Sequence, residues 1–462
     1  MRVAIIGGGI SGLTTAYYLT NGKDVPKELV EVTLFEKSET FGGKIQTVHQ
    51  DGYVIERGPD SFLKRKPAAM DLVKELGLTG QLIENKTGKS YILKGGKLHL
   101  IPPGSVMGVP KSIHAIMETG LLSTDGKARA LNDLFIPKLP PFDDISVGDF
   151  FAKRFGEELV DHLISPLLSG IYAGDIYKLS LATTLPQFLN AESEQGSLML
   201  GLQGKAPKKK TSQFATLNTG LQTVVEHLVE ALKASGVHLQ PKTEVEKISQ
   251  LDKGYEMGLS NGNATQFDAV IFALPHHLVE RLLPKVEFLK RNEAAPNTSV
   301  ATIAMAFDER DVRLSQEGTG FVSSRLEPKA LTACTWTHMK WSHAAPEGKA
   351  LLRTYVGKAG NDQVIYESDE FLVNKTLEEM SDVVTISGEP EFAVVSRWPE
   401  AMPQYPVGHQ AWLREVNRKL AQDLPNVQLV GASYDGVGLP DCIRQGKQAA
   451  LNLLEQLNEV KI

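Results

Sequence analysis

The chain has 462 residues, of which 42% are hydrophobic and 23% charged, and its formal net charge is −6. This composition is typical of a globular protein with two or three domains, and it gives no reason to expect a nucleic-acid partner. The two cysteines, Cys334 and Cys442, match neither a disulfide framework nor a zinc site, which favours a reducing, cytoplasmic location. No uncharged apolar run reaches the roughly 18 residues that cross a bilayer, so we expect no transmembrane segment and at most peripheral membrane contact.

The first predicted unit is a strand, a glycine-rich turn and a helix. The short apolar run "RVAII" precedes "GGGISG", residues 7–12, and apolar residues at helical spacing follow. This order is typical of a dinucleotide-binding βαβ unit. Gly7 would allow the tight turn, Gly9 the close approach of a pyrophosphate, and Gly12 the packing of the helix, whose N-terminus favours an anion. We assign the whole turn to the cofactor site: Gly7, Gly8, Gly9, Ile10, Ser11 and Gly12.

A second strand is predicted over "VEVTLFE", Val30 to Glu36. Its terminal Glu36 would bind the ribose hydroxyls, and we place the adjacent Lys37 in the same site. The acid lies somewhat beyond the usual spacing of about 20 residues, which the polar stretch over residues 21–28 would explain by lengthening the loop. The alternative is that Glu36 is an ordinary carboxylate at a strand end.

The next predicted elements are short and separated by turns. Paired glycines and a cation, "GGK", end at Lys44, and a strand over Tyr53 to Glu56 leads into the glycine-proline turn of "RGPDSF". We expect a helix over residues 68–76 and a hairpin over Gly95 and Gly96.

Residues 102–197 have a different character, with helical patterns punctuated by proline and glycine. This stretch predicts a helical domain. A lysine cluster follows it at Lys205, Lys208, Lys209 and Lys210. A solvated loop explains the cluster best, and weak contact with an anionic membrane surface or an acidic partner is the alternative.

Strand patterns return after residue 214. "FDAVIFALP" is typical of a parallel strand of the nucleotide-binding domain, and residues 298–397 predict a second, substrate-facing sheet. The chain ends with a strand, a glycine turn and an amphipathic helix. A metal site is not expected, because the adjacent His276 and His277 would point apart, and no metalloprotease or serine-hydrolase motif occurs.

Four motifs, in order along the whole chain, resemble those of flavin-dependent porphyrinogen oxidases of the soluble bacterial branch, within the flavin amine oxidase superfamily. They are "GGGISG", "FEKSETFGGKIQT", "DGYVIERGPDSF" and "GASYDGVGLPDCIRQGKQAA", and the internal "SPLLSGIYAGD" is similar as well. The resemblance implies an α/β fold with a Rossmann-type FAD-binding domain, a mixed-sheet substrate domain and a helical domain. We place the FAD-binding domain at 1–60, 215–297 and 398–462, the substrate domain at 61–101 and 298–397, and the helical domain at 102–214.

The resemblance also extends the site. FAD would be bound non-covalently, since Cys442 is expected inside the last helix as a small buried residue and not as an attachment point. Trp398 matches an aromatic near the flavin, although a plain core tryptophan is an equal alternative. Further residues expected at the cofactor are Lys44, Gly58, Pro59, Asp60, Ser61, Val245, Trp398, Val437, Gly438 and Leu439. Those expected at the substrate are Lys64, Arg65, Lys66 and Ile171.

The activity implied is the aromatisation of a porphyrinogen by oxygen, a six-electron oxidation that uses three O2 and yields three H2O2. No protein residue is expected to be catalytic, because hydride would pass to flavin N5. Coproporphyrinogen III is the expected substrate, in haem biosynthesis, and protoporphyrinogen IX is left open as a second one. Hand-over of the product to a downstream chelatase is a further expectation. The alternatives are another amine oxidase or desaturase of the superfamily, or a non-catalytic flavin or tetrapyrrole carrier.

Overall fold

The computed structural model describes residues 1–22, 30–86, 88–203, 212–291 and 296–459. A five-stranded parallel sheet forms around the N-terminal strand, in the order β10-β2-β1-β14-β22. The strand β1 is flanked on both sides, which explains its uninterrupted apolar sequence. The five strands are β1 (Arg2–Ile6), β2 (Glu31–Phe35), β10 (His238–Gln240), β14 (Ala269–Phe272) and β22 (Val427–Leu429).

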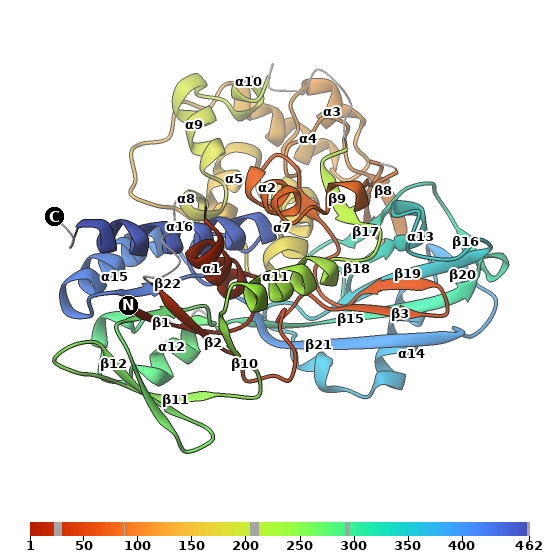
Figure 1. The fold of residues 1–462 in the computed structure, drawn as a ribbon. Helices are drawn as coiled ribbons and strands as arrows, with labels where there is room; N and C mark the ends of the chain where they lie inside the picture. The colour runs from red at the N-terminus through yellow and green to blue at the C-terminus, as the bar shows by residue number, and fades with distance from the viewer. Residues whose placement is uncertain (23–29, 87, 204–211, 292–295, 460–462) are drawn as a thin grey trace.

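Helices cover one face of the parallel sheet. The first helix, α1, packs between α11 and the long C-terminal helix α16, and α2 packs on α16, around one apolar core (Figure 1). The other face is covered by an antiparallel sheet and two helices, which enclose a second core. The elements on the first face are α1 (Ile10–Asn21), α2 (Pro67–Glu75), α11 (Gln222–Ala234) and α16 (Leu439–Glu459). Those on the second are β11 (Val245–Gln250), β12 (Tyr255–Leu259), β13 (Ala264–Phe267), α12 (His276–Leu282) and α15 (His409–Asp423).

A second large sheet has seven strands in the order β21-β15-β19-β18-β17-β7-β8. It is mixed, because β17 and β7 pair in parallel and the other pairs are antiparallel. The predicted hairpin is present as β7 and β8. The strands are β7 (Tyr91–Lys94), β8 (Lys97–Leu100), β15 (Thr298–Asp308), β17 (Gly320–Ser323), β18 (Leu331–Trp336), β19 (Lys349–Val356) and β21 (Phe392–Met402). Two helices accompany them, α13 (Thr337–Lys340) and α14 (Asp369–Met380).

The helical segment forms a separate layer (Figure 1). Its core contains aliphatic side chains and several phenylalanines. The buried Arg154 pairs with Asp133 at 2.7 Å and donates to the carbonyl oxygen of Pro137 at 3.0 Å. This pairing compensates the cost of burying both charges. The helices are α3 (Ile113–Glu118), α4 (Thr124–Leu131), α5 (Val147–Phe155), α6 (Glu157–Leu159), α7 (Ser165–Tyr172), α8 (Leu181–Thr184), α9 (Pro186–Gln195) and α10 (Leu198–Gly201).

Short strands connect these layers. The pair β3 and β4 precedes the glycine-proline turn, and a three-stranded sheet in the order β5-β9-β6 follows it. The strands are β3 (Thr47–Gln50), β4 (Tyr53–Glu56), β5 (Phe62–Leu63), β6 (Leu82–Glu84), β9 (Phe214–Leu217), β16 (Val312–Leu314) and β20 (Val384–Ile386).

Most of the predicted elements are present within a residue or two of their expected bounds. The helix expected over 68–76 is Pro67–Glu75, and the strand Tyr53–Glu56 is as predicted. The domain ranges stay a prediction, and β21 runs through the boundary we placed between residues 397 and 398. The four clustered lysines, Lys205 to Lys210, and most of the loop expected over 21–28 lie outside the described residues. Within the described part of the chain, no helix combines the length and apolar character that a bilayer crossing requires.

Candidate active site

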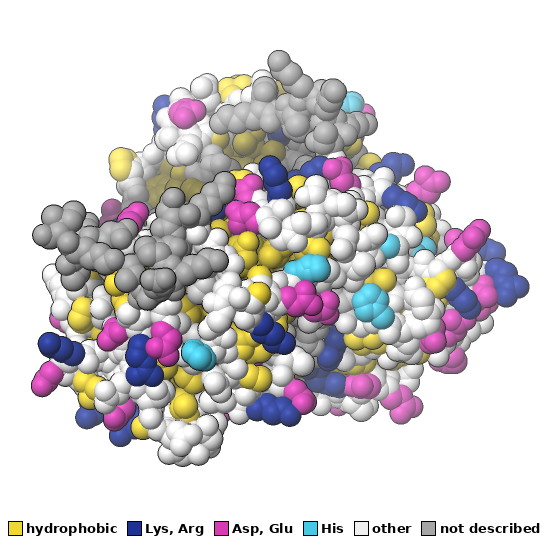
Figure 2. Space-filling view, in the orientation of Figure 1, with side chains coloured by type: hydrophobic (Ala, Val, Ile, Leu, Met, Phe, Trp, Pro, Cys, Tyr) yellow, Lys and Arg dark blue, Asp and Glu magenta, His cyan; other side chains and the backbone are white. Residues whose placement is uncertain are grey.

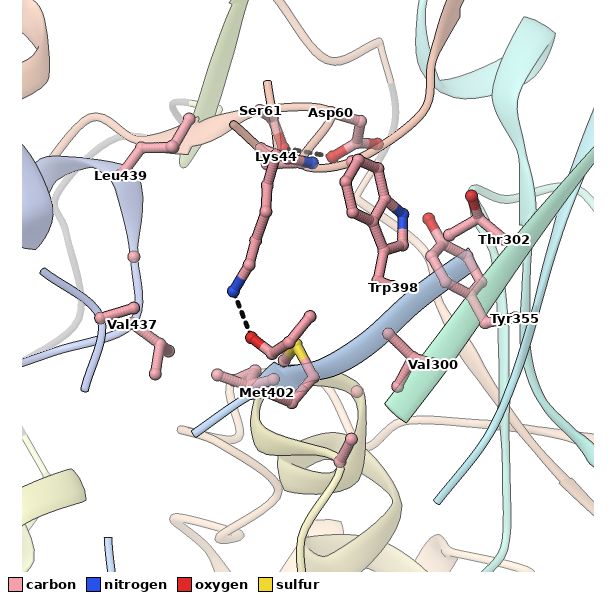
Figure 3. Close-up of a pocket in the computed structure, with 18 of the residues that line it drawn as sticks. Lys44, Asp60, Ser61, Val300, Thr302, Tyr355, Trp398, Met402, Val437 and Leu439 are labelled. Atoms are coloured by element: carbon pink, nitrogen blue, oxygen red, sulfur yellow. Dashed lines mark hydrogen bonds between the residues drawn. The ribbon is translucent and has the colours of Figure 1, made fainter. Parts of the chain in front are cut away.

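A cavity of about 2700 Å³ lies between the two large sheets and α7. Its wall includes the glycine turn, strands of the seven-stranded sheet and residues of α7. Figure 3 shows its middle part, where Trp398, Thr302 and Tyr355 lie on one side and Val437 and Leu439 on the other, with the Lys44 side chain between them in this view. On the outer surface, by contrast, positive and negative side chains are intermixed over the face in view (Figure 2).

The glycine turn forms a cradle at one end of the cavity. Gly7 has a φ of 107°, and a Cβ there would lie 2.5 Å from the carbonyl oxygen of Ala273. A Cβ on Gly12 would lie 2.0 Å from the carbonyl oxygen of Gly7, so the turn needs glycine there as well. A Cβ on Gly9 would meet nothing within 4 Å, because this position faces the cavity. The open space beside Gly9, at the uncapped start of α1, fits a diphosphate group.

Within this turn, the structure separates lining residues from supporting ones. Gly7, Gly9, Ile10 and Ser11 line the cavity, whereas Gly8 and Gly12 are not part of its wall. Gly12 supports the turn by packing closely against the Gly7 carbonyl oxygen. Gly8 supports it by donating its backbone N–H to a carboxylate.

That carboxylate belongs to Glu36, which lies at the end of β2 and lines the cavity. One of its oxygens accepts from the Gly8 N–H at 2.7 Å and the other from the Ser38 N–H at 2.8 Å. These bonds fix the carboxylate and leave lone pairs for hydroxyl donors. Lys37 and Val245 line the same end. The ribose and adenine roles given to these residues stay predictions.

Lys44 places a cation inside the cavity. Its ammonium group donates a hydrogen bond to the carbonyl oxygen of Ala401, and its side chain crosses the cavity (Figure 3). Burial lowers the pKa of Lys44. The backbone of Lys44 also requires glycine at position 58, because a Cβ on Gly58 would lie 1.9 Å from the Lys44 carbonyl oxygen.

Hydrogen bonds hold the turn that begins at Gly58. The buried guanidinium of Arg353 donates to the carbonyl oxygens of Gly58 and Arg57. The Arg57 oxygen also accepts from Trp398 Nε1 at 3.1 Å and from Thr302 Oγ1 at 2.9 Å. Trp398 therefore lies on the cavity wall, and its indole is oriented by the backbone of the glycine-proline turn.

Asp60 completes this network. Its carboxylate accepts from Lys340 Nζ at 2.7 Å and from Ser61 Oγ at 2.7 Å. Burial alone would raise the pKa of Asp60, but the charges of Lys340 and Arg353 and these hydrogen bonds hold it below its usual range. Pro59, Asp60 and Ser61 all line the cavity, and their contact with the cofactor stays a prediction.

The opposite wall is formed by the start of α16. Val437, Gly438 and Leu439 line the cavity at the N-terminus of this helix. Cys442 lies one turn further on, where burial raises the pKa of its thiol to about 11. The thiol is thus neutral near pH 7, and its location inside the helix agrees with the prediction.

The cations expected at the substrate have different surroundings. Lys64 forms an ion pair with Glu84 and lines the cavity together with Arg65 and Ile171. Lys66 is not among the residues that line the cavity, and its ammonium binds Asp441 at 2.6 Å. The substrate contact of Lys66 stays a prediction, as do those of Lys64, Arg65 and Ile171.

The structure adds lining residues that the sequence analysis missed. Val300, Thr302, Arg353 and Tyr355 come from β15 and β19, in the segment predicted only as a substrate-facing sheet. A charged residue inside the apolar strand "KALLRTYV" was a usable signal for Arg353, because an arginine is rarely buried without a specific partner.

The two adjacent histidines are separated as expected. His276 is buried and contacts the Leu289 carbonyl at 2.8 Å, whereas His277 Nδ1 lies 3.2 Å from Asn297. Within the described ranges, no group of three or more potential metal ligands comes together.

Comparisons with known proteins agree with this geometry. The family model described as flavin containing amine oxidoreductase matches residues 10–454. A coproporphyrinogen III oxidase of Bacillus subtilis (strain 168) is 48% identical, covering 99% of this chain and 98% of that protein. The Staphylococcus aureus protein of the same name is 40% identical, with 98% and 99% covered. A crystal structure from Exiguobacterium sp. 255-15, a protein named provisionally as a protoporphyrinogen oxidase, has a TM-score of 0.89 at 38% identity, with 98% and 99% covered.

Proposed function

The chain belongs to the flavin containing amine oxidoreductase family, and we propose that within it the protein is an FAD-dependent oxidase that converts coproporphyrinogen III to coproporphyrin III. The observation that carries the proposal is the likeness over nearly the whole chain to proteins named for this activity, two of them at 48% and 40% identity. The oxidation belongs to haem biosynthesis. Protoporphyrinogen IX, which carries two propionates instead of four, is the natural comparison substrate.

The size and lining of the cavity support two ligands side by side. Cavities for a single small ligand are usually about 300–1,000 Å³, and this one is about 2700 Å³. The glycine cradle at one end suits the diphosphate of FAD. The space between Trp398 and α7, lined by Ile171 and Tyr355, suits an apolar macrocycle.

Bound FAD would supply the acceptor for the hydride that leaves a meso carbon of the porphyrinogen. The chain's own contribution is to hold the ligands and to exclude water. Arg353 fixes the backbone turn over Gly58, and Lys44 places a positive charge in the middle of the cavity. The positive charge of Lys44 would stabilise the negative charge that the flavin gains on reduction. The partial positive charge at the N-terminus of α16 would have the same effect.

The overall reaction removes six electrons and six protons from the macrocycle. Three O2 would accept them as three H2O2, and the porphyrin would pass on to a chelatase. The protein would act in the cytoplasm, where its two buried cysteines stay reduced.

The test is a substrate comparison with purified holoprotein. We expect coproporphyrin fluorescence to appear with coproporphyrinogen III faster than in an enzyme-free blank, and no oxygen uptake with amines such as putrescine. Uptake with amines alone would indicate an amine oxidase. A flavin-loaded protein that leaves the blank rate unchanged would be a carrier.

A further inference from the structure

Four cations gather on one part of the cavity wall, next to the three-stranded sheet β5-β9-β6. We call this part the cationic wall, and its members are Lys64, Arg65, Lys86 and Lys340. Lys64 and Arg65 directly follow β5, and Lys86 lies two residues after β6. The backbone N–H of Lys86 donates to the carbonyl oxygen of Lys340 at 3.0 Å, which joins the last two members.

Two of these cations already have carboxylate partners. Lys64 is paired with Glu84, and Lys340 is paired with Asp60 at 2.7 Å. Lys340 is held further by the ring of Phe214, with 5.7 Å between its ammonium and the ring centroid. The charge of each of these two ammonium groups is therefore already balanced by a carboxylate.

Arg65 and Lys86 differ from them. Both side chains are exposed, both line the cavity, and neither has a side-chain partner among the residues that the structure describes. The cationic wall thus carries two positive charges in excess of its carboxylates, although the whole chain has a net charge of −6. An uncompensated positive wall on an acidic protein indicates an anionic ligand.

We propose that Arg65 and Lys86 bind propionate carboxylates of the tetrapyrrole, and that this pair sets a preference for a tetracarboxylate over a dicarboxylate. The inference rests on the proposed function, because it takes the ligand class from there. The sequence analysis anticipated Arg65, whereas Lys86 becomes a candidate only through the fold, which brings residues 65 and 86 to the same wall. Arg65 can bind a carboxylate through two N–H donors, and Lys86 binds as a point charge.

The geometry also predicts the size of the effect. An exposed ion pair contributes little to the free energy of binding. Loss of one such pair should weaken the affinity for the substrate by about 1.5- to fivefold. Removal of both cations should therefore raise the Michaelis constant for coproporphyrinogen III by about two- to twenty-fivefold. Protoporphyrinogen IX should be affected less, because it offers half as many carboxylates.

The experiment uses the holoenzyme and the variants Arg65→Ala, Lys86→Ala and the double variant. Lys97→Ala is the matched control, since Lys97 is an exposed lysine on β8 that does not line the cavity. Lys86→Arg should retain most of the wild-type Michaelis constant, because the charge is kept. FAD content should stay the same in all of these variants, and kcat should change little.

Salt provides a second readout. The Michaelis constant of the wild type for coproporphyrinogen III should rise with ionic strength, and that of the double variant should rise less. The inference is overturned if the double variant matches the Lys97→Ala control, or if both substrates lose affinity equally. A wild-type enzyme that does not oxidise coproporphyrinogen III would instead refute the proposed function, and this is measured before any variant is compared.

Discussion

Gly9 offers a perturbation that separates cofactor binding from folding. Its backbone has φ −74° and ψ 179°, a conformation open to any L-residue, and a Cβ there would meet nothing within 4 Å. Replacing Gly9 by valine should therefore leave the apoprotein folded. Valine restricts the unfolded chain more than glycine does, and this loss of entropy should stabilise the folded apoprotein by up to about 1 kcal/mol.

The same side chain would lie where we place the diphosphate. Forcing atoms into an occupied, well-packed space costs about 1–3 kcal/mol, and every 1.4 kcal/mol weakens binding about tenfold. Gly9→Val should thus raise the dissociation constant for FAD by about 5- to 150-fold. Gly9→Ala should do so less, since it adds one carbon.

Gly12→Ala is the contrasting variant. Its Cβ would lie 2.0 Å from the Gly7 carbonyl oxygen, so it should destabilise the apoprotein itself. The assay pairs flavin titration of the apoprotein with urea denaturation followed by far-UV circular dichroism. A Gly9→Val protein with wild-type FAD affinity would refute the diphosphate assignment. A Gly9→Val apoprotein as unstable as Gly12→Ala would refute the claim that this side of the turn is open.

Three further predictions test the network around the cavity. Acid precipitation should release all of the flavin into solution, because Cys442 is a neutral, buried thiol, and colour that stays with the pellet would contradict non-covalent binding. Arg353→Met should lower the free energy of unfolding by about 3–5 kcal/mol, because the partly buried Asp60 loses a positive neighbour and two carbonyl oxygens lose a donor. A loss under 1 kcal/mol in chemical denaturation would be evidence against that role. Burial raises the pKa of Glu56 from 4.5 to about 7. Between these two pH values the folded state therefore binds more protons than the unfolded state. The free energy of unfolding should fall by about 3 kcal/mol as the pH rises from 4.5 to 7. Glu56→Gln keeps an acceptor for the Leu221 N–H and should flatten that slope in denaturations at pH 5 and pH 8, whereas an unchanged slope would show that Glu56 is not its source.

The sequence predicted the contiguous motifs of the cavity wall better than the charged network that holds them. The glycine turn, Glu36, the Gly58–Ser61 turn and the start of α16 are contiguous motifs, so each could be recognised from neighbouring residues alone. All of them except Gly8 and Gly12 reach the cavity wall. Gly8 and Gly12 are needed by the turn itself, which short-range spacing cannot distinguish from ligand contact.

The charged network depends on contacts between segments that are far apart in the sequence. Arg353 reaches Gly58 across 295 positions in the sequence, and Lys340 reaches Asp60 across 280. Lys66 differs from Lys64 and Arg65 in a way that the run of three cations could not indicate, because its ammonium binds a carboxylate. Its partner, Asp441, lies at the far end of the chain. Local patterns carry no information on such partners, which explains why the charged network could not be assigned from the sequence.

The most direct test of the central claim is the ratio of oxygen consumed to coproporphyrin III formed. Purified holoenzyme would be given coproporphyrinogen III in an oxygen-electrode cell, with the porphyrin measured by absorbance and an enzyme-free blank subtracted. The Gly9→Val apoprotein serves as the matched protein control. An FAD oxidase of this substrate predicts three O2 consumed per porphyrin, with three H2O2 formed and no rate above the blank for the control. Porphyrin formation at the blank rate, with the flavin-loaded protein present, would contradict the account.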